Sequence, residues 1–398
     1  MVIKFEAKLV KKLSGFYLSS YTSQTGEVRY LGTTQMEPTG AREAFPCFDE
    51  PAMKAEFSLT IVREKKYITL FNTRLKSSAR YDKGVDLMVD SFESSVKMST
   101  YLVAFIVAPN YSYLNSTTKG NVRVYAPDEL IDRAKFALQA AVTVLDYYDK
   151  LYAIKYPLPK QDLIAIPDFS AGAMENWGLI TYRMTSILYD PVSSSSSDQQ
   201  WVATVVAHEL AHQWFGDLVT LKWWNDLWLN EGFASFMEYL GTDQVAKAIG
   251  KKWQMNDQFI KSDLQRAMFF DSLKSSHPIE VQVKNPDEIN DLFDDISYSK
   301  GSSIIRMLRD VMGVERFNSG ITAYLKKYKY GNTVTKDLWN SLSQGTSIDV
   351  ALIMDTWTKQ MGYPVINVKR SGNTITLTQE RYLLYPNSTD TGEFSSPF

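Results

Sequence analysis

The sequence has 398 residues, of which 44% are hydrophobic and 22% charged; these proportions are typical of soluble globular proteins, and the length suits two or three domains. The formal net charge of −2 excludes a strongly basic surface for nucleic acid, and no apolar run approaches the roughly 20 residues of a membrane span. The single cysteine, Cys47, excludes an intrachain disulfide.

The first part of the chain is expected to form β-strands. Short runs rich in β-branched and aromatic residues occur at 55–62, 67–71 and 102–107, separated by turn residues and charges. This pattern predicts an all-β layer, which we interpret as a partial β-sandwich-like domain over residues 1–122.

The pattern changes after Pro127 to apolar residues at helical spacing. A short strand is expected at 162–166, and a helix is expected from about residue 198 to Gly216. Further helices are expected at 128–153, around Glu231, and at 252–270, 287–293, 302–312, 314–329 and 349–361. We interpret residues 123–361 as a mostly helical domain. Two strands, at 365–368 and 374–377, predict the start of a third β domain over residues 362–398, so the fold class is multidomain α+β.

A His-Glu-x-x-His motif lies within the helix expected from residue 198. His208 and His212 are four positions apart, so on a helix they lie on one face, one turn apart. Two imidazoles at this spacing can hold one zinc ion, and Glu209 beside them is a candidate general base. A chance match is the alternative, but the sequence has only three histidines, and two are here. The third, His277, has no partner at ligand spacing and is interpreted as structural.

A third zinc ligand is expected in the next helix. Glu231 follows His212 by 19 positions, and the neighbouring Trp228 favours a part-buried position for it over a solvated one. Hydrolytic zinc sites take three protein ligands and keep one position for water, whose pKa falls towards ~7. We therefore expect one zinc ion per chain, held by the two histidines and Glu231. Glu209 could take the proton of the water and pass it to a leaving amine.

This motif and several further blocks resemble the aminopeptidase N family of gluzincin zinc aminopeptidases. The resemblance includes the spacing of His208, His212 and Glu231 and covers essentially the whole chain. The other matching blocks are Gly172-Ala173-Met174-Glu175-Asn176, Thr34-Gln35-Met36-Glu37-Pro38, Phe45-Pro46-Cys47-Phe48-Asp49-Glu50-Pro51, Trp223-Trp224-Asn225-Asp226, and the run from Phe293 to Gly301. The resemblance implies an N-terminal β domain followed by a thermolysin-like catalytic domain.

The resemblance also implies an activity and the residues that perform it. The activity would be zinc-dependent hydrolysis of the N-terminal peptide bond of peptides, with a neutral or broad preference for the first residue. Glu175 and Gln35 would bind the free α-ammonium group of the peptide, and Tyr298 would donate a hydrogen bond to the oxyanion that forms at the zinc. The stretch Gly172, Ala173, Met174, Glu175 and Asn176 could pair with the extended substrate as an added strand.

Two other functions compete with this reading. A thermolysin-like endopeptidase would share the zinc motif, but the Gly172 to Asn176 block opposes it. A receptor or scaffold built on an inactive peptidase would share the fold, but such proteins usually lose the base or a ligand. Here Glu209, Tyr298 and all three zinc ligands are present.

The chain is expected to be the core of a longer protein, because the resemblance implies further residues before Met1 and further domains after Phe398. Sequons at Asn110, Asn115 and Asn387 favour a glycoprotein of the secretory pathway or the plasma membrane, whereas the lack of disulfides favours a cytoplasmic alternative. The expected partners are peptides with a free N-terminus and no nucleic acid. The full-length protein could form a homodimer.

Overall fold

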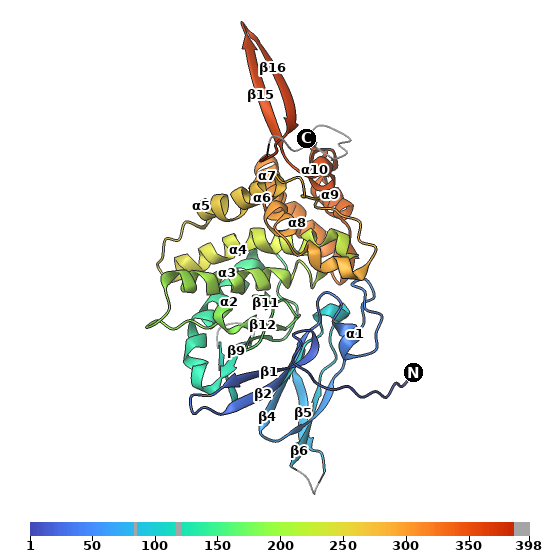
Figure 1. The fold of residues 1–398 in the computed structure, drawn as a ribbon, viewed down its shortest axis with the longest axis vertical. Helices are drawn as coiled ribbons and strands as arrows, with labels where there is room; N and C mark the ends of the chain where they lie inside the picture. Colours follow the sequence, from blue (N-terminus) through green and yellow to red (C-terminus); the bar gives the residue numbers. More distant parts are fainter. Residues whose placement is uncertain (83–85, 117–120, 386–398) are drawn as a thin grey trace. The chain divides into compact units, whose positions relative to one another are not determined.

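The computed structural model describes residues 1–82, 86–116 and 121–385 (Figure 1). The chain divides into two compact units, which are described separately below. The first comprises Met1–Thr220, Met237–Trp253 and Lys329–Asn332, and the second comprises Leu221–Phe236, Gln254–Tyr328 and Thr333–Phe398. One helix, α4 (Trp228–Ala248), is continuous and contributes residues to both units.

The N-terminal part of the first unit is β-rich, as the sequence predicts. A four-stranded sheet has the order β1 (Gly15–Thr22), β2 (Val28–Gln35), β7 (Phe105–Pro109) and β4 (Tyr67–Phe71). A three-stranded sheet has the order β3 (Thr60–Glu64), β6 (Leu87–Phe92) and β5 (Leu75–Arg80). β1 and β2 pair in full register, from Gly15 opposite Gln35 to Thr22 opposite Val28. This register places Gln35 at the end of β2.

Two predicted strands in this part begin later than expected. β3 begins at Thr60, because the backbone N–H of Phe57 donates to Ser95 Oγ at 2.9 Å instead of joining a strand ladder. β7 begins at Phe105, because the preceding Thr100–Leu102 forms a 3₁₀ turn, η1. A short helix, α1 (Ala41–Ala44), follows β2. The predicted strand at 67–71 is confirmed as β4.

The first unit also contains a five-stranded mixed sheet. Its order is β11 (Ala173–Met174), β12 (Leu179–Arg183), β10 (Gln161–Ile166), β9 (Val122–Pro127) and β8 (Tyr111–Asn115). β10 pairs in parallel with both neighbours, and all of its residues are buried, which explains its apolar run from Leu163 to Ile166. β8 and β9 thus share a sheet with β10. The boundary expected between residues 122 and 123 stays a prediction.

Helices α2 (Lys135–Leu151), α3 (Ser196–His212) and α4 lie side by side (Figure 1). The Tyr148 hydroxyl of α2 lies 3.1 Å from Ala207 O of α3 and 2.9 Å from Met237 O of α4. Gly241 allows this approach, because a Cβ there would lie 2.7 Å from that hydroxyl. The segment before α2 is a 3₁₀ turn, η2 (Asp128–Ala134), rather than the α-helix that the sequence predicts.

The second unit is mostly helical. Its helices are α5 (Met255–Phe259), α6 (Gln265–Asp271), α7 (Gly301–Met312), α8 (Val314–Tyr328), α9 (Thr335–Leu342) and α10 (Val350–Lys359). The helix expected at 252–270 is interrupted by a π-helical turn, η5 (Ile260–Leu264), and the sequence analysis missed α9. The short turns are η3 (Met184–Ser186) of the first unit, and η4 (Trp224–Asp226), η6 (Pro286–Leu292) and the π-helical η7 (Ile296–Lys300) of the second. The two short strands β13 (Val219–Leu221) and β14 (Gly331–Thr333) pair with each other.

The described chain ends in a two-stranded ribbon of β15 (Pro364–Ser371) and β16 (Thr374–Arg381), as predicted (Figure 1). The assignment of this ribbon to a third domain stays a prediction. Within the described residues, no helix combines the length and the hydropathy needed to cross a membrane.

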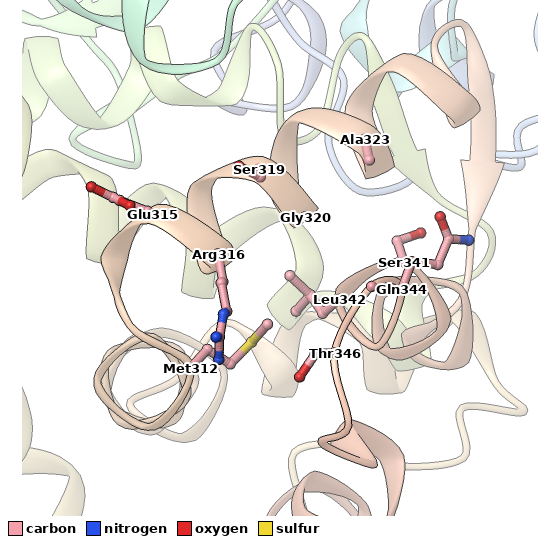
Figure 2. Close-up of a pocket in the computed structure, with 11 residues that line it drawn as sticks. Met312, Glu315, Arg316, Ser319, Gly320, Ala323, Ser341, Leu342, Gln344 and Thr346 are labelled. Carbon is pink, nitrogen blue, oxygen red and sulfur yellow. The ribbon is translucent and has the colours of Figure 1, made fainter.

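A surface pocket of about 360 Å³ lies between α8 and α9 (Figure 2). Its lining is Met312, Glu315, Arg316, Ser319, Gly320, Ala323, Ser341, Leu342, Gln344, Gly345 and Thr346. No residue that the sequence predicts to be functional is among them.

Candidate active site

Helix α3 carries the histidine pair, and both of its ends are set by local hydrogen bonds. Ser195 Oγ accepts from Asp198 N at 3.1 Å, and Asp198 Oδ2 accepts from Ser195 N at 2.7 Å, a reciprocal cap that starts the helix as the serine run predicts. The helix ends at His212 rather than at Gly216. The chain instead turns back, and Asp217 N donates to His212 O at 3.0 Å. Gly216 is outside the helix, with a φ of 128°.

The two histidine rings face each other through their Nε2 atoms, which are 3.1 Å apart. On the far side of each ring, Nδ1 has an oxygen partner. His208 Nδ1 lies 2.7 Å from Glu238 Oε2, and His212 Nδ1 lies 2.9 Å from the carbonyl oxygen of Phe215. The His212 side chain is buried, and the His208 side chain is 14% exposed.

These contacts fix the tautomers of both rings and favour a metal between them. A carbonyl oxygen only accepts, so Phe215 O places the proton of neutral His212 on Nδ1, and the Glu238 carboxylate does the same for His208. Both Nε2 atoms then carry lone pairs that point into one space, and they repel each other unless a cation lies between them. A carboxylate behind a histidine is a common arrangement at metal sites. The donor set therefore fits a zinc ion.

Two buried carboxylates lie next to this pair within the first unit. Potential ligand atoms of Glu175, Glu209 and His212 all lie within 4.8 Å of one another, and Glu175 Oε1 is 3.9 Å from His212 Nδ1. Glu175 is 3% exposed and Glu209 is 5% exposed. Two buried carboxylates at this separation repel each other, and a cationic ligand between them would relieve the repulsion.

The predicted substrate-binding stretch, Gly172 to Asn176, forms the edge of the five-stranded sheet. β11 pairs with β12, with Ala173 opposite Tyr182 and Met174 opposite Thr181. Glu175 follows this strand directly. Gln35, from the end of β2, is 8% exposed, and its Nε2 lies 3.5 Å from Met174 Sδ. Gln35 therefore lies next to the stretch that carries Glu175.

The buried acids also act on nearby ionisable groups. Burial raises the pKa of the Asp217 carboxyl well above its ordinary range, and the negative charges of Glu175 and Glu209 raise it further. Neither Asp217 carboxylate oxygen has a hydrogen-bond partner among the described residues. Burial lowers the pKa of Lys54 to about 7, although the charge of Asp217 opposes this shift. Burial and the neighbouring Glu175 and Glu209 thus favour the neutral form of the Asp217 carboxyl.

The second unit holds the other two predicted residues. Glu231 lies in the first turn of α4 and is 2% exposed. The next residue, Gly232, packs directly on the turn η7, because a Cβ there would lie 3.1 Å from Gly301 C and 3.3 Å from Ser297 O. Tyr298 belongs to the same turn and is half-buried. Within this unit, Glu231 and the Tyr298 turn are therefore held together by close backbone packing.

Helix α4 also carries a second acidic residue, Glu238. Glu231 and Glu238 are seven residues apart, which is two helical turns, so both side chains lie on the same face of α4. Glu238 already contacts His208. In the second unit the start of α4 is anchored by Asp226, whose Oδ1 accepts from Thr335 Oγ1 at 2.7 Å, and by Trp228 Nε1, which donates to Thr335 Oγ1 at 2.9 Å.

The sequence analysis missed two side chains that order this region, Glu238 and Gln213. Glu238 could have been found from its helical spacing to Glu231. Gln213 is fully buried after α3, and its Nε2 lies 3.1 Å from Glu175 O and 3.2 Å from Glu209 O. No pattern in the sequence indicates the contact of Gln213 with Glu175, which lies 38 positions earlier in the chain.

Two family models match the chain. Residues 136–357 match the Peptidase family M1 domain, and residues 1–102 match the Peptidase M1 N-terminal domain. The first range contains both histidines, Glu209, Glu231 and Tyr298, and the second contains Gln35.

Three similar proteins, from a mouse, a pig and a yeast, are all named as aminopeptidases. Endoplasmic reticulum aminopeptidase 1 of Mus musculus is 46% identical over 411 residues, covering 96% of this chain and 43% of that protein. Glutamyl aminopeptidase of Sus scrofa is 47% identical, covering 98% of this chain and 40% of that protein. Alanine/arginine aminopeptidase of Saccharomyces cerevisiae is 47% identical, covering 96% of this chain and 44% of that protein. The chain thus spans less than half the length of these relatives.

Proposed function

Because this chain belongs to peptidase family M1, we propose that it carries the active site of a zinc-dependent aminopeptidase, which hydrolyses the first peptide bond of peptides. The observation that carries the proposal is the His208 and His212 pair, with Nε2 atoms 3.1 Å apart and both Nδ1 atoms engaged, beside the buried Glu209 and Glu175. This arrangement offers a metal site, a base and an acidic pocket within one unit.

The proposed zinc ligands are His208, His212 and Glu231. The facing lone pairs of the histidines support the first two, and the position of Glu231 on the same face of α4 as Glu238 supports the third. Zinc bound there would supply a water molecule of lowered pKa and a positive charge near the reacting carbonyl. Three protein ligands leave a position open for that chemistry.

Glu209 is the proposed general base. It is adjacent to His208 in sequence, and its carboxylate lies within the cluster formed with Glu175 and His212, so it is near the metal position without being needed as a ligand. A carboxylate in this place accepts a proton from the attacking water and donates it to the leaving amine. Tyr298 is the proposed donor to the oxyanion, and the packing of its turn against Gly232 supports a fixed position relative to Glu231.

Glu175 is the proposed recognition group for the substrate α-ammonium, with Gln35 in support. A charge-assisted hydrogen bond from the ammonium to a buried carboxylate fixes the first residue of the peptide and places its peptide bond at a set distance from the metal. The buried negative charge around Glu175 and Glu209 supports a cationic ligand here. An endopeptidase would have no use for this pocket, so the exopeptidase function is favoured.

The preference for the first residue is proposed to be neutral or broad. It rests on Gln35, whose amide is neutral and contacts Met174. The named relatives include a glutamyl and an alanine/arginine aminopeptidase, so chains of similar sequence differ in this property. A panel of amino-acid amides with acidic, basic and neutral first residues would measure the preference.

We also propose a place for the full-length protein in the secretory pathway or at the plasma membrane. One relative is named for the endoplasmic reticulum, and the sequon residues Asn110 and Asn115 are both exposed. The Asn387 sequon lies outside the described residues. A loss of mass on glycosidase treatment of protein from its native cell would support this location, and an unmodified chain would favour the cytoplasmic alternative. Light scattering on the full-length protein would test the homodimer.

The central experiment combines metal analysis with hydrolysis. The full-length protein should contain one zinc ion per chain, hydrolyse free amino-acid p-nitroanilides, lose this activity with a chelator, and regain it when zinc is added back. N-acetylated p-nitroanilides serve as the control, because they lack the ammonium. Folded protein that cleaves blocked substrates equally well would indicate an endopeptidase. Folded, zinc-loaded protein without any hydrolysis would favour the scaffold alternative.

A further inference from the structure

Gln213 connects the backbone of the proposed base to the backbone of the proposed ammonium-binding residue. Its side chain is completely buried at the end of α3. The carboxamide Nε2 donates to Glu175 O at 3.1 Å and to Glu209 O at 3.2 Å. The carboxamide Oε1 accepts a longer bond from Gly178 N at 3.5 Å. Both N–H groups of the amide and its oxygen thus have backbone partners.

This connection does more than end a helix. The backbone N–H of Gln213 donates to Leu210 O at 3.3 Å, so the helical carbonyl of Glu209 receives the side-chain amide. One N–H would be enough for that cap. The second N–H donates to the carbonyl of Glu175, which lies 38 positions earlier in the chain and follows the edge strand β11. A planar amide with two fixed donors sets the distance between the two carbonyl groups that it joins.

Other contacts hold the Glu175 segment, but they connect it to β12 and, through Met174, to Gln35. Asn176 Nδ2 donates to Thr181 Oγ1 at 3.0 Å, and Met174 pairs with Thr181 in the strand ladder. These contacts fix the segment relative to β12, not relative to α3. Gln213 links it to the helix that carries the histidines and Glu209.

An aminopeptidase must place the ammonium and the first carbonyl carbon of the substrate at their positions simultaneously. The two groups belong to the same residue and are separated by one carbon, so the distance between the ammonium pocket and the metal decides which bond is cut. Catalytic geometry of this kind must hold within about 0.5 Å, and a 1 Å error can cost about 100-fold in rate. A side chain that joins the two backbones directly is placed to control that distance.

We propose that Gln213 is a positioning residue that sets the spacing between the ammonium pocket of Glu175 and the metal helix α3, and so selects substrates with an α-amino group. The inference rests on the proposed function. It predicts that loosening this connection relaxes the choice between α-amino and β-amino substrates. A β-amino substrate carries the same ammonium one carbon further from the scissile carbonyl, so it reports on spacing and not on charge.

The test is Gln213→Met in the full-length protein, because methionine has a similar length and no N–H donors. The substrates are alanine p-nitroanilide and β-alanine p-nitroanilide, and the readout is the ratio of their kcat/KM values. Gln213→Met should bind zinc as the wild type does and lower the α-to-β ratio by at least about 10-fold. Gln213→Leu, which removes both donors without adding a charge, should lower the same ratio and serves if the methionine variant does not fold.

Thr181→Val is the matched control. It removes one buried hydrogen bond from the same segment, that of Asn176 Nδ2, without touching the link to α3. It should lower stability and leave the α-to-β ratio unchanged. An unchanged ratio in a folded, zinc-loaded Gln213 variant overturns the inference, and so does an equal change in Thr181→Val. A wild-type protein that cleaves neither substrate overturns the proposed function and this inference with it, so the two failures are distinguishable.

Discussion

His277 and Asp294 form an ion pair, with His277 Nε2 2.7 Å from Asp294 Oδ2. Asp294 also caps the turn that carries Tyr298. Its Oδ1 accepts from Ile296 N at 3.0 Å and from Ser297 N at 3.1 Å, and its carbonyl accepts from Tyr298 N at 3.1 Å. His277, which we interpreted as structural, therefore supports Asp294, the residue that caps the Tyr298 turn.

This pair predicts a pH-dependent contribution to stability. Burial lowers the pKa of His277, but the hydrogen bond and charge of Asp294 outweigh it, and the pKa is raised above 6.5 despite an opposing effect of Lys300. His277 Nδ1 also faces the Pro278 carbonyl at 2.7 Å, so both ring nitrogens face acceptors and favour the charged form. The folded state thus binds the proton more tightly than the unfolded state. The contribution is fully present below the unfolded pKa and is lost as pH rises through the raised folded pKa.

His277→Gln should therefore destabilise the protein by about 1 kcal/mol near pH 5.5, a value that allows for partial exposure of the pair, and by less near pH 8.5. Glutamine keeps a polar group and has no charge at either pH, so it isolates the titration. The measurement is denaturant unfolding of both proteins at the two pH values. An equal destabilisation at both would show that the charge of His277 has no role.

Glu238→Gln should weaken zinc binding by about 10- to 100-fold, the usual effect of losing a partner behind a ligand histidine. Its carboxylate holds the Nδ1–H of His208. At saturating zinc the variant should keep a kcat close to that of the wild type. The measurement is competition with a chromogenic chelator. Asp243→Asn is the control on the same helix. Among the contacts described for Asp243, its ion pair is with the surface residue Lys247. The zinc affinity of the Asp243→Asn variant should therefore equal that of the wild type.

Glu209→Gln should keep its zinc and lose at least about 100-fold in kcat, because the amide cannot accept the proton of water. Zinc content and kcat on an amino-acid p-nitroanilide are measured on the same sample. Near-normal turnover in the metal-loaded variant would show that another group is the base.

Tyr298→Phe should lower kcat by about 100- to 1000-fold, which is the scale for losing one donor to an oxyanion. KM should change little, because the hydrogen bond forms in the transition state. Tyr328→Phe is the control in the same unit, since it removes a hydroxyl that donates to Asp337 at 3.2 Å. Equal kcat values for the wild type and Tyr298→Phe would remove this residue from the mechanism.

Glu175→Gln should lower kcat/KM for free amino-acid substrates by about 10- to 100-fold, which corresponds to the loss of a charge-assisted hydrogen bond of about 1.5–3 kcal/mol. Binding of the N-acetylated analogue should hardly change, because that analogue has no ammonium. The measurements are kcat/KM for the free substrate and Ki for the acetylated one. If both fall equally, Glu175 has a structural role and does not recognise the N-terminus.

Much of the fold follows from local patterns. The strand at 67–71, the buried strand β10 and helix α8 form where the sequence predicts them, because short β-rich runs favour the strands and apolar residues at helical spacing favour the helix. The predictions fail where a side chain or a turn replaces a regular hydrogen bond. Examples are the late start of β3, where Ser95 takes the N–H of Phe57, and the end of α3 at His212.

The sequence by itself determined that His208 and His212 share a helical face, because four positions make about one turn in any α-helix. It also placed Glu209 beside them and showed the blocks that indicate the family. Only the tertiary structure decided which oxygens lie behind the histidines, and that Gln213 joins Glu175 to Glu209. The contact of His208 with Glu238 and that of Gln213 with Glu175 join residues 30 and 38 positions apart, and they depend on how whole helices and sheets pack. The periodicity of a single segment contains no information about them.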